Sequence, residues 1–156
     1  MITRRNVLAL AAASLVVSAC SGKTPDPAVA PLSLYRGETP ETRALIKKYA
    51  TIHEIPESLL HRVIQRESTY NSAARNGPYF GLMQISTQTA RGMGYSGPPA
   101  GLLDAETNLR FAGKYLKGAW LVSRGDQSAA VMWYARGYYY EAKRLGLLEE
   151  TGRGIG

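Results

Sequence analysis

Helical patterns lie on both sides of a long stretch, residues 71–101, that has neither a helical nor a strand period of its own. Glycine and proline recur throughout it, and one short helical turn is expected there, from Thr87 to Arg91 with Ser86 as its N-cap. A stretch this long without regular structure is uncommon in a compact domain and usually has a function. The sequence therefore predicts helices built around a functional loop region.

Capping signals and apolar residues at helical spacing predict where the helices lie. Thr39 and Pro40 open the first helix, and Asp104 is expected to cap the longest. The alternation typical of strands is not visible, and neither is an internal repeat, so the fold class is all-α or nearly so. The predicted helices cover residues 40–50, 56–67, 105–123, 128–135 and 138–146.

Glu67 lies where a helix that begins with Pro56 would be expected to carry an apolar side chain. At about 100° per residue, it falls in the sector of four apolar residues of the same helix. A carboxylate on an apolar stripe loses solvation, so its pKa should rise, as a general acid at neutral pH requires. The helix alone leaves an alternative open, in which it ends at Ser68 and Glu67 extends into water. The four apolar residues are Leu59, Leu60, Val63 and Ile64.

The first nineteen residues have the pattern of a secretory signal peptide. Arg4 and Arg5 precede an apolar run over residues 7–17, which is too short to span a bilayer as a helix. The run ends in Val17-Ser18-Ala19-Cys20, which resembles the lipobox of bacterial lipoproteins. That resemblance implies cleavage before Cys20 and lipidation of this cysteine, which gives stable anchoring when several acyl chains insert. The alternative is an ordinary secretory signal with a chance cysteine.

These terminal features predict the location and the domain organisation. The lipobox predicts a lipid anchor, and we expect the protein in the periplasm of a Gram-negative bacterium. Ser21, in place of the aspartate that often retains lipoproteins at the inner membrane, favours the outer membrane. Residues 20–36, rich in proline, alanine and serine, are expected to form the lipidated cysteine and a flexible tether. A single domain is then expected over 37–148, followed by a disordered tail over 149–156.

The charge balance narrows the choice of partners. The predicted signal holds two of the 19 basic residues, so the mature chain keeps 17 basic against 12 acidic side chains. A surplus of this size suits nucleic acid, an anionic lipid surface or a polyanionic wall polymer. Export and the absence of a dense basic run argue against nucleic acid. Since Cys20 is the only cysteine, an internal disulfide is excluded.

Common catalytic constellations are missing from the sequence. His53 and His61 are the only histidines, and neither has a partner at metal-ligand spacing. A Gly-x-Ser-x-Gly elbow is also absent, so nucleophilic acyl transfer is not supported. We therefore expect neither a metal nor a cofactor.

Several ordered motifs remain, and together they resemble one family. Glu67-Ser68 is followed by a Gly-Leu-Met-Gln stretch, a Thr-Ala pair, an Asn…Gly-x-Tyr-Leu element and a tyrosine. In this order and spacing, the chain resembles the lysozyme-like catalytic domain of bacterial lytic transglycosylases, of the soluble and goose-lysozyme-related type. The resemblance covers roughly residues 45–139. The later motifs are Gly81-Leu82-Met83-Gln84, Thr89-Ala90, the run from Asn108 to Leu116, and Tyr134.

Two segments depart from the family pattern. Tyr134-Ala135-Arg136-Gly137 stands where the family commonly has Tyr-Asn-Ala-Gly. The stretch before Gly81 reads Asn76-Gly77-Pro78-Tyr79-Phe80, where the family often has a Gly-Ala pair. Both departures bear on substrate contacts near Tyr134 and Tyr79, and neither alters Glu67.

The resemblance implies a lysozyme-like helical domain with a catalytic cleft and a role for each site residue. It implies cleavage of the peptidoglycan bond between N-acetylmuramic acid and N-acetylglucosamine, with 1,6-anhydro ends. Glu67 would act first as the acid and then as the base, since Asp104 and Asp126 are better used as helix caps and leave no obvious second carboxylate. Four further residues would contact the substrate: Ser68, Met83, Gln84 and Tyr134.

Each of these residues also has a structural alternative. Ser68 would cap the helix end, Gln84 would satisfy loop backbone, and Met83 and Tyr134 would be core residues. For the whole protein, the alternatives are a goose-type lysozyme that uses water and a non-catalytic peptidoglycan-binding lipoprotein. The expected partners are peptidoglycan glycan strands and the membrane that holds the lipid, with wall-spanning secretion or division machinery as a further candidate.

Overall fold

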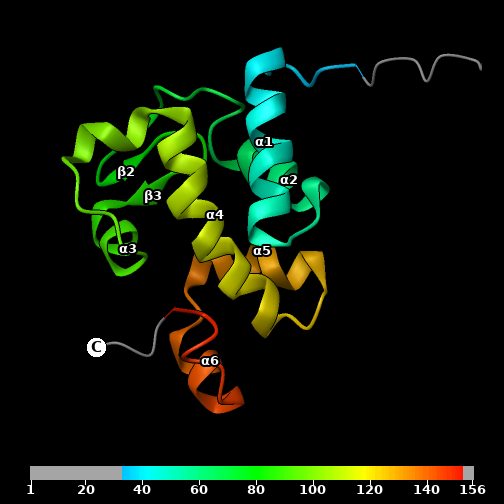
Figure 1. Ribbon diagram of the computed structural model, residues 1–156, viewed down its shortest axis with the longest axis vertical. Helices are drawn as coiled ribbons and strands as arrows, with labels where there is room; N and C mark the ends of the chain where they lie inside the picture. Colours follow the sequence, from blue (N-terminus) through cyan, green and yellow to red (C-terminus); the bar gives the residue numbers. More distant parts are fainter. Residues whose placement is uncertain (1–32, 153–156) are drawn as a thin grey trace, which may run out of the picture. The chain divides into compact units, whose positions relative to one another are not determined.

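The computed structural model describes residues 33–152 (Figure 1). The predicted signal peptide, Cys20 and most of the predicted tether lie outside the described residues, as do residues 153–156. Within the described part, no helix is both long enough and apolar enough to cross a membrane. The elements, in chain order, are α1 (Pro40–His53), α2 (Glu57–Glu67), β1 (Arg75–Asn76), β2 (Tyr79–Phe80), β3 (Ile85–Ser86), α3 (Thr87–Gly92), the 3₁₀ helix η1 (Pro99–Leu103), α4 (Ala105–Val122), α5 (Gln127–Arg136) and α6 (Tyr139–Leu145).

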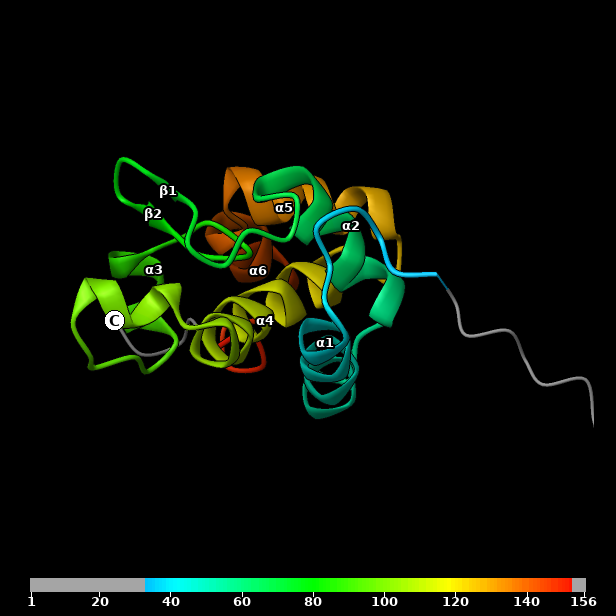
Figure 2. The ribbon, with the colours of Figure 1, turned by 90° about the horizontal axis from the view of Figure 1, so that it is seen from above.

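Helix α4 forms the centre of the unit (Figures 1 and 2). Helices α1 and α2 lie on one side of it, and the small sheet and α3 lie on the other. Helices α1, α3, α5 and α6 all contact α4. Two glycines permit the close packing: a Cβ at Gly113 would lie 2.5 Å from the His53 ring, and one at Gly118 would overlap the Tyr138 hydroxyl. Helix α4 therefore needs small residues at these two points.

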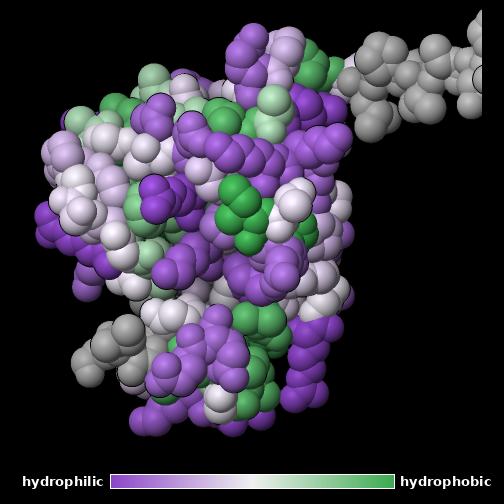
Figure 3. Space-filling view, viewed as in Figure 1, coloured by the Kyte–Doolittle hydropathy of each residue, from purple (hydrophilic) through white to green (hydrophobic). Residues whose placement is uncertain are grey.

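Apolar stripes of the helices face inward and form one core. Leu59, Leu60 and Ile64 of α2 and Leu109 and Leu116 of α4 are fully buried. The face shown in Figure 3 is mostly hydrophilic, and its hydrophobic residues are confined to small patches. This distribution is what amphipathic helices around a common core produce.

The predicted helix caps are confirmed. Thr39 accepts a hydrogen bond from the Thr42 amide at 3.2 Å, and Asp104 accepts one from the Thr107 amide at 2.8 Å. Asp126 likewise caps α5, and Ser86 caps α3. Some helix ends differ from the prediction. Helix α2 begins at Glu57, and Pro56, expected at the first helical position, is its N-cap residue. Helix α1 continues to His53, and α6 begins at Tyr139 and ends at Leu145.

The structure is mostly helical, as predicted, with one small addition. Strands β1, β2 and β3 form an antiparallel sheet in that order, with Arg75 opposite Phe80 and Tyr79 opposite Ser86. Each strand has only two residues. Strands this short are too brief to produce a visible alternating pattern in the sequence, so the sheet was not predicted.

Contacts with the domain are also made on both sides of residues 37–148. The Tyr35 ring, in the segment expected to be a tether, stacks on Tyr70 with centroids 5.8 Å apart. The Tyr35 amide donates to the buried Glu38 carboxylate at 2.9 Å, and Arg43 pairs with the same carboxylate. At the other end, Thr151, in the segment expected to be a tail, is buried and donates to the Leu147 carbonyl at 2.7 Å.

Candidate active site

Two adjoining cavities, of about 270 Å³ and about 310 Å³, lie between the ends of α2 and α5 and the small sheet. Because they share four residues, they form one cleft, and their size is within the range of small-ligand sites. Arg66, Glu67 and Asn76 line only the first cavity, whereas Ser86, Thr89 and Arg136 are among those that line only the second. The shared residues are Tyr79, Gln84, Tyr134 and Ala135.

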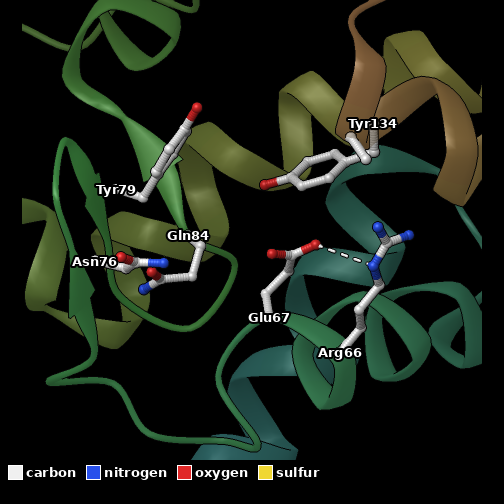
Figure 4. Close-up of a pocket in the computed structure, with 7 residues that line it drawn as sticks. Arg66, Glu67, Asn76, Tyr79, Gln84 and Tyr134 are labelled. Atoms are coloured by element: carbon white, nitrogen blue, oxygen red, sulfur yellow. Dashed lines mark ion pairs between the residues drawn. The ribbon is translucent and has the colours of Figure 1, made fainter.

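Glu67 is the last residue of α2, and its side chain lies at the first cavity with 25% of its surface exposed (Figure 4). The helix does end here, as the sequence alternative supposed, but the carboxylate does not extend freely into water. Partial burial raises the pKa of Glu67, as its place on the apolar stripe predicts. The guanidinium of Arg66, with Nε 3.6 Å from Glu67 Oε1, acts in the opposite direction and lowers that pKa.

Tyr134 comes from α5 and lies across the cleft from Tyr79, above Glu67 (Figure 4). Its hydroxyl donates to the Met83 carbonyl at 2.8 Å. Burial, and then the negative charge of Glu67, raise the pKa of Tyr134 well above its ordinary value. Tyr134 therefore remains a neutral hydrogen-bond donor that fixes the loop opposite α5.

Ser68 and Met83, predicted to contact the substrate, line neither cavity. The Ser68 hydroxyl donates to the Leu82 carbonyl at 2.7 Å and so ties the loop to the end of α2. Met83 is fully buried. The structure places Met83 in the core rather than at the cleft floor, which is the alternative that the sequence left open.

Gln84 lines both cavities and also has the structural role considered for it. Its Nε2 donates to the carbonyls of Gly81 and Ala74, at 2.9 and 3.1 Å. Its backbone adopts a positive φ of 48°, which a non-glycine residue rarely does. The side chain therefore stabilises a strained turn and leaves only its carbonyl oxygen for a ligand.

Asn108 holds the loop in place and was given no role in the sequence prediction. This side chain is fully buried at the start of α4. Its Oδ1 accepts from the Met83 amide at 2.9 Å, and its Nδ2 donates to the carbonyls of Phe80 and Leu102, both at 2.8 Å. An asparagine four residues before Ala112, on the buried stripe of an amphipathic helix, is the signal that could have identified it.

Glu67 is the only carboxylate among the described residues that line the cleft. Over residues 33–152, no three histidine, cysteine, aspartate or glutamate side chains lie close enough together to hold a metal ion. The chemistry available in the first cavity is thus that of one partly buried acid beside an arginine, an asparagine, a glutamine and two tyrosines.

A mostly helical domain with a small three-stranded sheet is consistent with the lysozyme-like class. Residues 44–147 match the model of the transglycosylase SLT domain. Because the match spans well over half of the chain, this protein belongs to the transglycosylase SLT domain family, a family of peptidoglycan lytic transglycosylases. The match confirms the family resemblance and the mostly helical, lysozyme-like fold that the sequence predicts.

Proposed function

We propose that this protein is a lytic transglycosylase that cleaves the β-1,4 bond between N-acetylmuramic acid and N-acetylglucosamine and leaves 1,6-anhydro ends. The observation that carries the proposal is Glu67, the one carboxylate among the described cleft residues, with its pKa raised by burial. Membership of the transglycosylase SLT domain family supports peptidoglycan as the substrate.

A single carboxylate favours a reaction in which the substrate supplies the nucleophile. Most glycosidases use two carboxyl groups, about 5 Å or about 6.5–9.5 Å apart. Here protonated Glu67 would give its proton to the glycosidic oxygen as the C1–O bond breaks, with help from the neighbouring acetamido group. The Glu67 carboxylate would then take the proton of the muramoyl C6 hydroxyl as its oxygen bonds to C1. Glu67 ends protonated again, and no water is consumed.

The products distinguish this reaction from hydrolysis. Purified wall sacculi treated with the native protein should release fragments with anhydro ends, which are one water lighter than reducing ends and resist borohydride. Mass spectrometry before and after borohydride treatment measures both. Fragments with reducing ends alone would instead establish a goose-type hydrolase, and no fragments at all would favour the non-catalytic lipoprotein.

We further propose that lipidation of Cys20 anchors the enzyme to the periplasmic face of the outer membrane. The lipobox-like sequence before Cys20 and the serine after it support this location. Recruitment by a wall-spanning secretion or division machine fits the same location. Cell fractionation tests the anchor, because Cys20→Ala should move the protein from the membrane to the soluble fraction, and a native distribution would contradict it.

Arg66→Gln is expected to move the alkaline limb of the pH–rate profile to higher pH. Glu67 must be protonated to act as the acid, so the rate falls as the pH rises through its pKa. Since Arg66 lowers that pKa, removing its charge raises the pKa and keeps Glu67 protonated to a higher pH. Initial rates of fragment release across the pH range measure the shift.

Arg62→Gln is the matched control for this experiment. Arg62 is also on α2, but its guanidinium donates to the Ser128 hydroxyl and it does not line the cleft. The pH–rate profile of Arg62→Gln should coincide with that of the native enzyme. An alkaline limb that moved to lower pH in Arg66→Gln would contradict the assignment of Glu67 as the acid.

A further inference from the structure

Tyr79 stands at the point where the two halves of the cleft meet. The two-residue turn before it, Gly77-Pro78, has Gly77 at a φ of 56°. Because Pro78 cannot adopt a positive φ, only a type II′ turn fits, and such turns hold short hairpins in a fixed twist. Successive residues of β2 face opposite ways, so Phe80 is buried and Tyr79 is 47% exposed on the cleft side.

The hairpin that carries Tyr79 is firmly attached to the domain. The Phe80 carbonyl accepts from Asn108, and the Phe80 ring lies under the Arg75 guanidinium at 4.9 Å. The Gly81 amide donates to the Ala74 carbonyl at 2.8 Å. A side chain on this hairpin is therefore presented to the cleft from a fixed position, which lowers the entropy that binding would cost.

The Tyr79 ring differs from the other cleft rings in having no partner. Tyr134 contacts Tyr115 with centroids 5.3 Å apart, and Tyr115 stacks on Tyr138. No ring, cation or hydrogen-bond partner contacts the Tyr79 side chain within residues 33–152. A large, half-exposed, unpaired aromatic ring on a fixed support is a feature of a binding surface rather than of a core.

The position of the ring indicates which ligand it suits. Tyr79 and Tyr134 approach from opposite sides, and Glu67 lies below the gap between them (Figure 4). A sugar ring has an apolar face of C–H groups, which carry a small positive charge and match the negative face of an aromatic ring. A glycan strand that passes from the first cavity to the second must pass Tyr79, because this residue lines both cavities.

We propose that Tyr79 is a substrate-binding residue whose ring stacks on the face of a sugar next to the bond that is cleaved. This inference rests on the proposed function, since it assumes a glycan strand in the cleft with its scissile bond at Glu67. The hydroxyl of Tyr79 is not required, and the aromatic face supplies the contact.

Tyr79→Ala is expected to weaken glycan binding by about three- to tenfold, the range that aromatic contacts of this kind contribute. Binding is measured with purified glycan strands in a Glu67→Gln background, where no turnover occurs, and KM is measured in the native background. Tyr79→Phe keeps the ring and should bind within about twofold of the native protein. The melting temperature should change little, because Tyr79 is half-exposed and its side chain has no ring, cation or hydrogen-bond partner within residues 33–152.

Tyr140→Ala is the control, since Tyr140 is 84% exposed and lines neither cavity. It should bind glycan as the native protein does. The inference would be overturned if Tyr79→Ala bound glycan with native affinity. It would also be overturned if Tyr79→Phe bound glycan as weakly as Tyr79→Ala, because the contact would then be assigned to the hydroxyl. Failure of the proposed function has a different signature, because the native enzyme itself would then release no anhydro fragments.

Discussion

Glu67→Gln is expected to abolish the release of soluble fragments from wall sacculi, with a rate loss of at least about 10²-fold and up to about 10⁴-fold. Glutamine keeps the shape of the side chain but can neither donate the proton in the first step nor accept it in the second. Because the described cleft residues include no other carboxylate, no neighbour can take over either role. Fragment release, followed by chromatography or turbidity, measures the loss.

Stability separates loss of chemistry from loss of fold in this variant. Burial raises the pKa of Glu67 in the folded protein, so at neutral pH its charge opposes folding, and this cost disappears as the pH falls through that pKa. The neutral glutamine removes the cost, so the melting temperature should stay equal or rise. Sacculus binding should also remain.

Glu54→Gln is the matched control for the charge change. Its carboxylate is 82% exposed, pairs with Lys117 on the surface and lies outside the cleft. It should retain native activity. If the Glu67→Gln variant kept more than about a tenth of native activity, the assignment of Glu67 as the acid and base would be wrong.

Helices were predictable from the sequence because their signals are local. Asp104, Thr39 and Asp126 mark helix starts with side-chain hydrogen bonds that reach only three residues along the chain. The bounds of α4 were therefore predicted to within about one residue. The sheet depends instead on the Gly77-Pro78 turn and on contacts from α4, and a two-residue strand has no period to detect.

The site was predictable to the level of position along the chain, but not of side-chain direction. Glu67 could be identified because a carboxylate interrupts an apolar stripe. Met83 and Gln84 are neighbours in one motif, yet one is in the core and the other lines the cleft. Which of them faces the cleft is set by the positive φ of Gln84, which depends on tertiary contacts that spacing does not encode.

Asn108→Ala is expected to destabilise the domain by about 3 kcal/mol or more. The substitution removes the Asn108 hydrogen bonds to three buried backbone groups: the Met83 amide and the carbonyls of Phe80 and Leu102. Each such group costs about 1–3 kcal/mol when its partner is lost. For a domain of this size, the melting temperature should fall by about 10 °C or more. Thermal unfolding followed by circular dichroism measures this, and Asn71→Ala, whose Oδ1 accepts only from the exposed Ala73 amide, is the control.

Asn108→Asp tests whether hydrogen bonding, rather than volume, carries this effect. Aspartate keeps an oxygen for the Met83 amide but places its second oxygen against the carbonyls of Phe80 and Leu102. These carbonyls and full burial should raise the pKa of the new carboxyl group in the folded state, so the variant should regain stability as the pH falls through that pKa. A loss of stability in Asn108→Asp that does not depend on pH and is no larger than that of Asn71→Ala would contradict the role of hydrogen bonding. The Asn108 side chain also positions Met83, whose carbonyl accepts the hydrogen bond from the Tyr134 hydroxyl. Both Asn108 variants should therefore cleave peptidoglycan more slowly, even at temperatures well below their unfolding transitions.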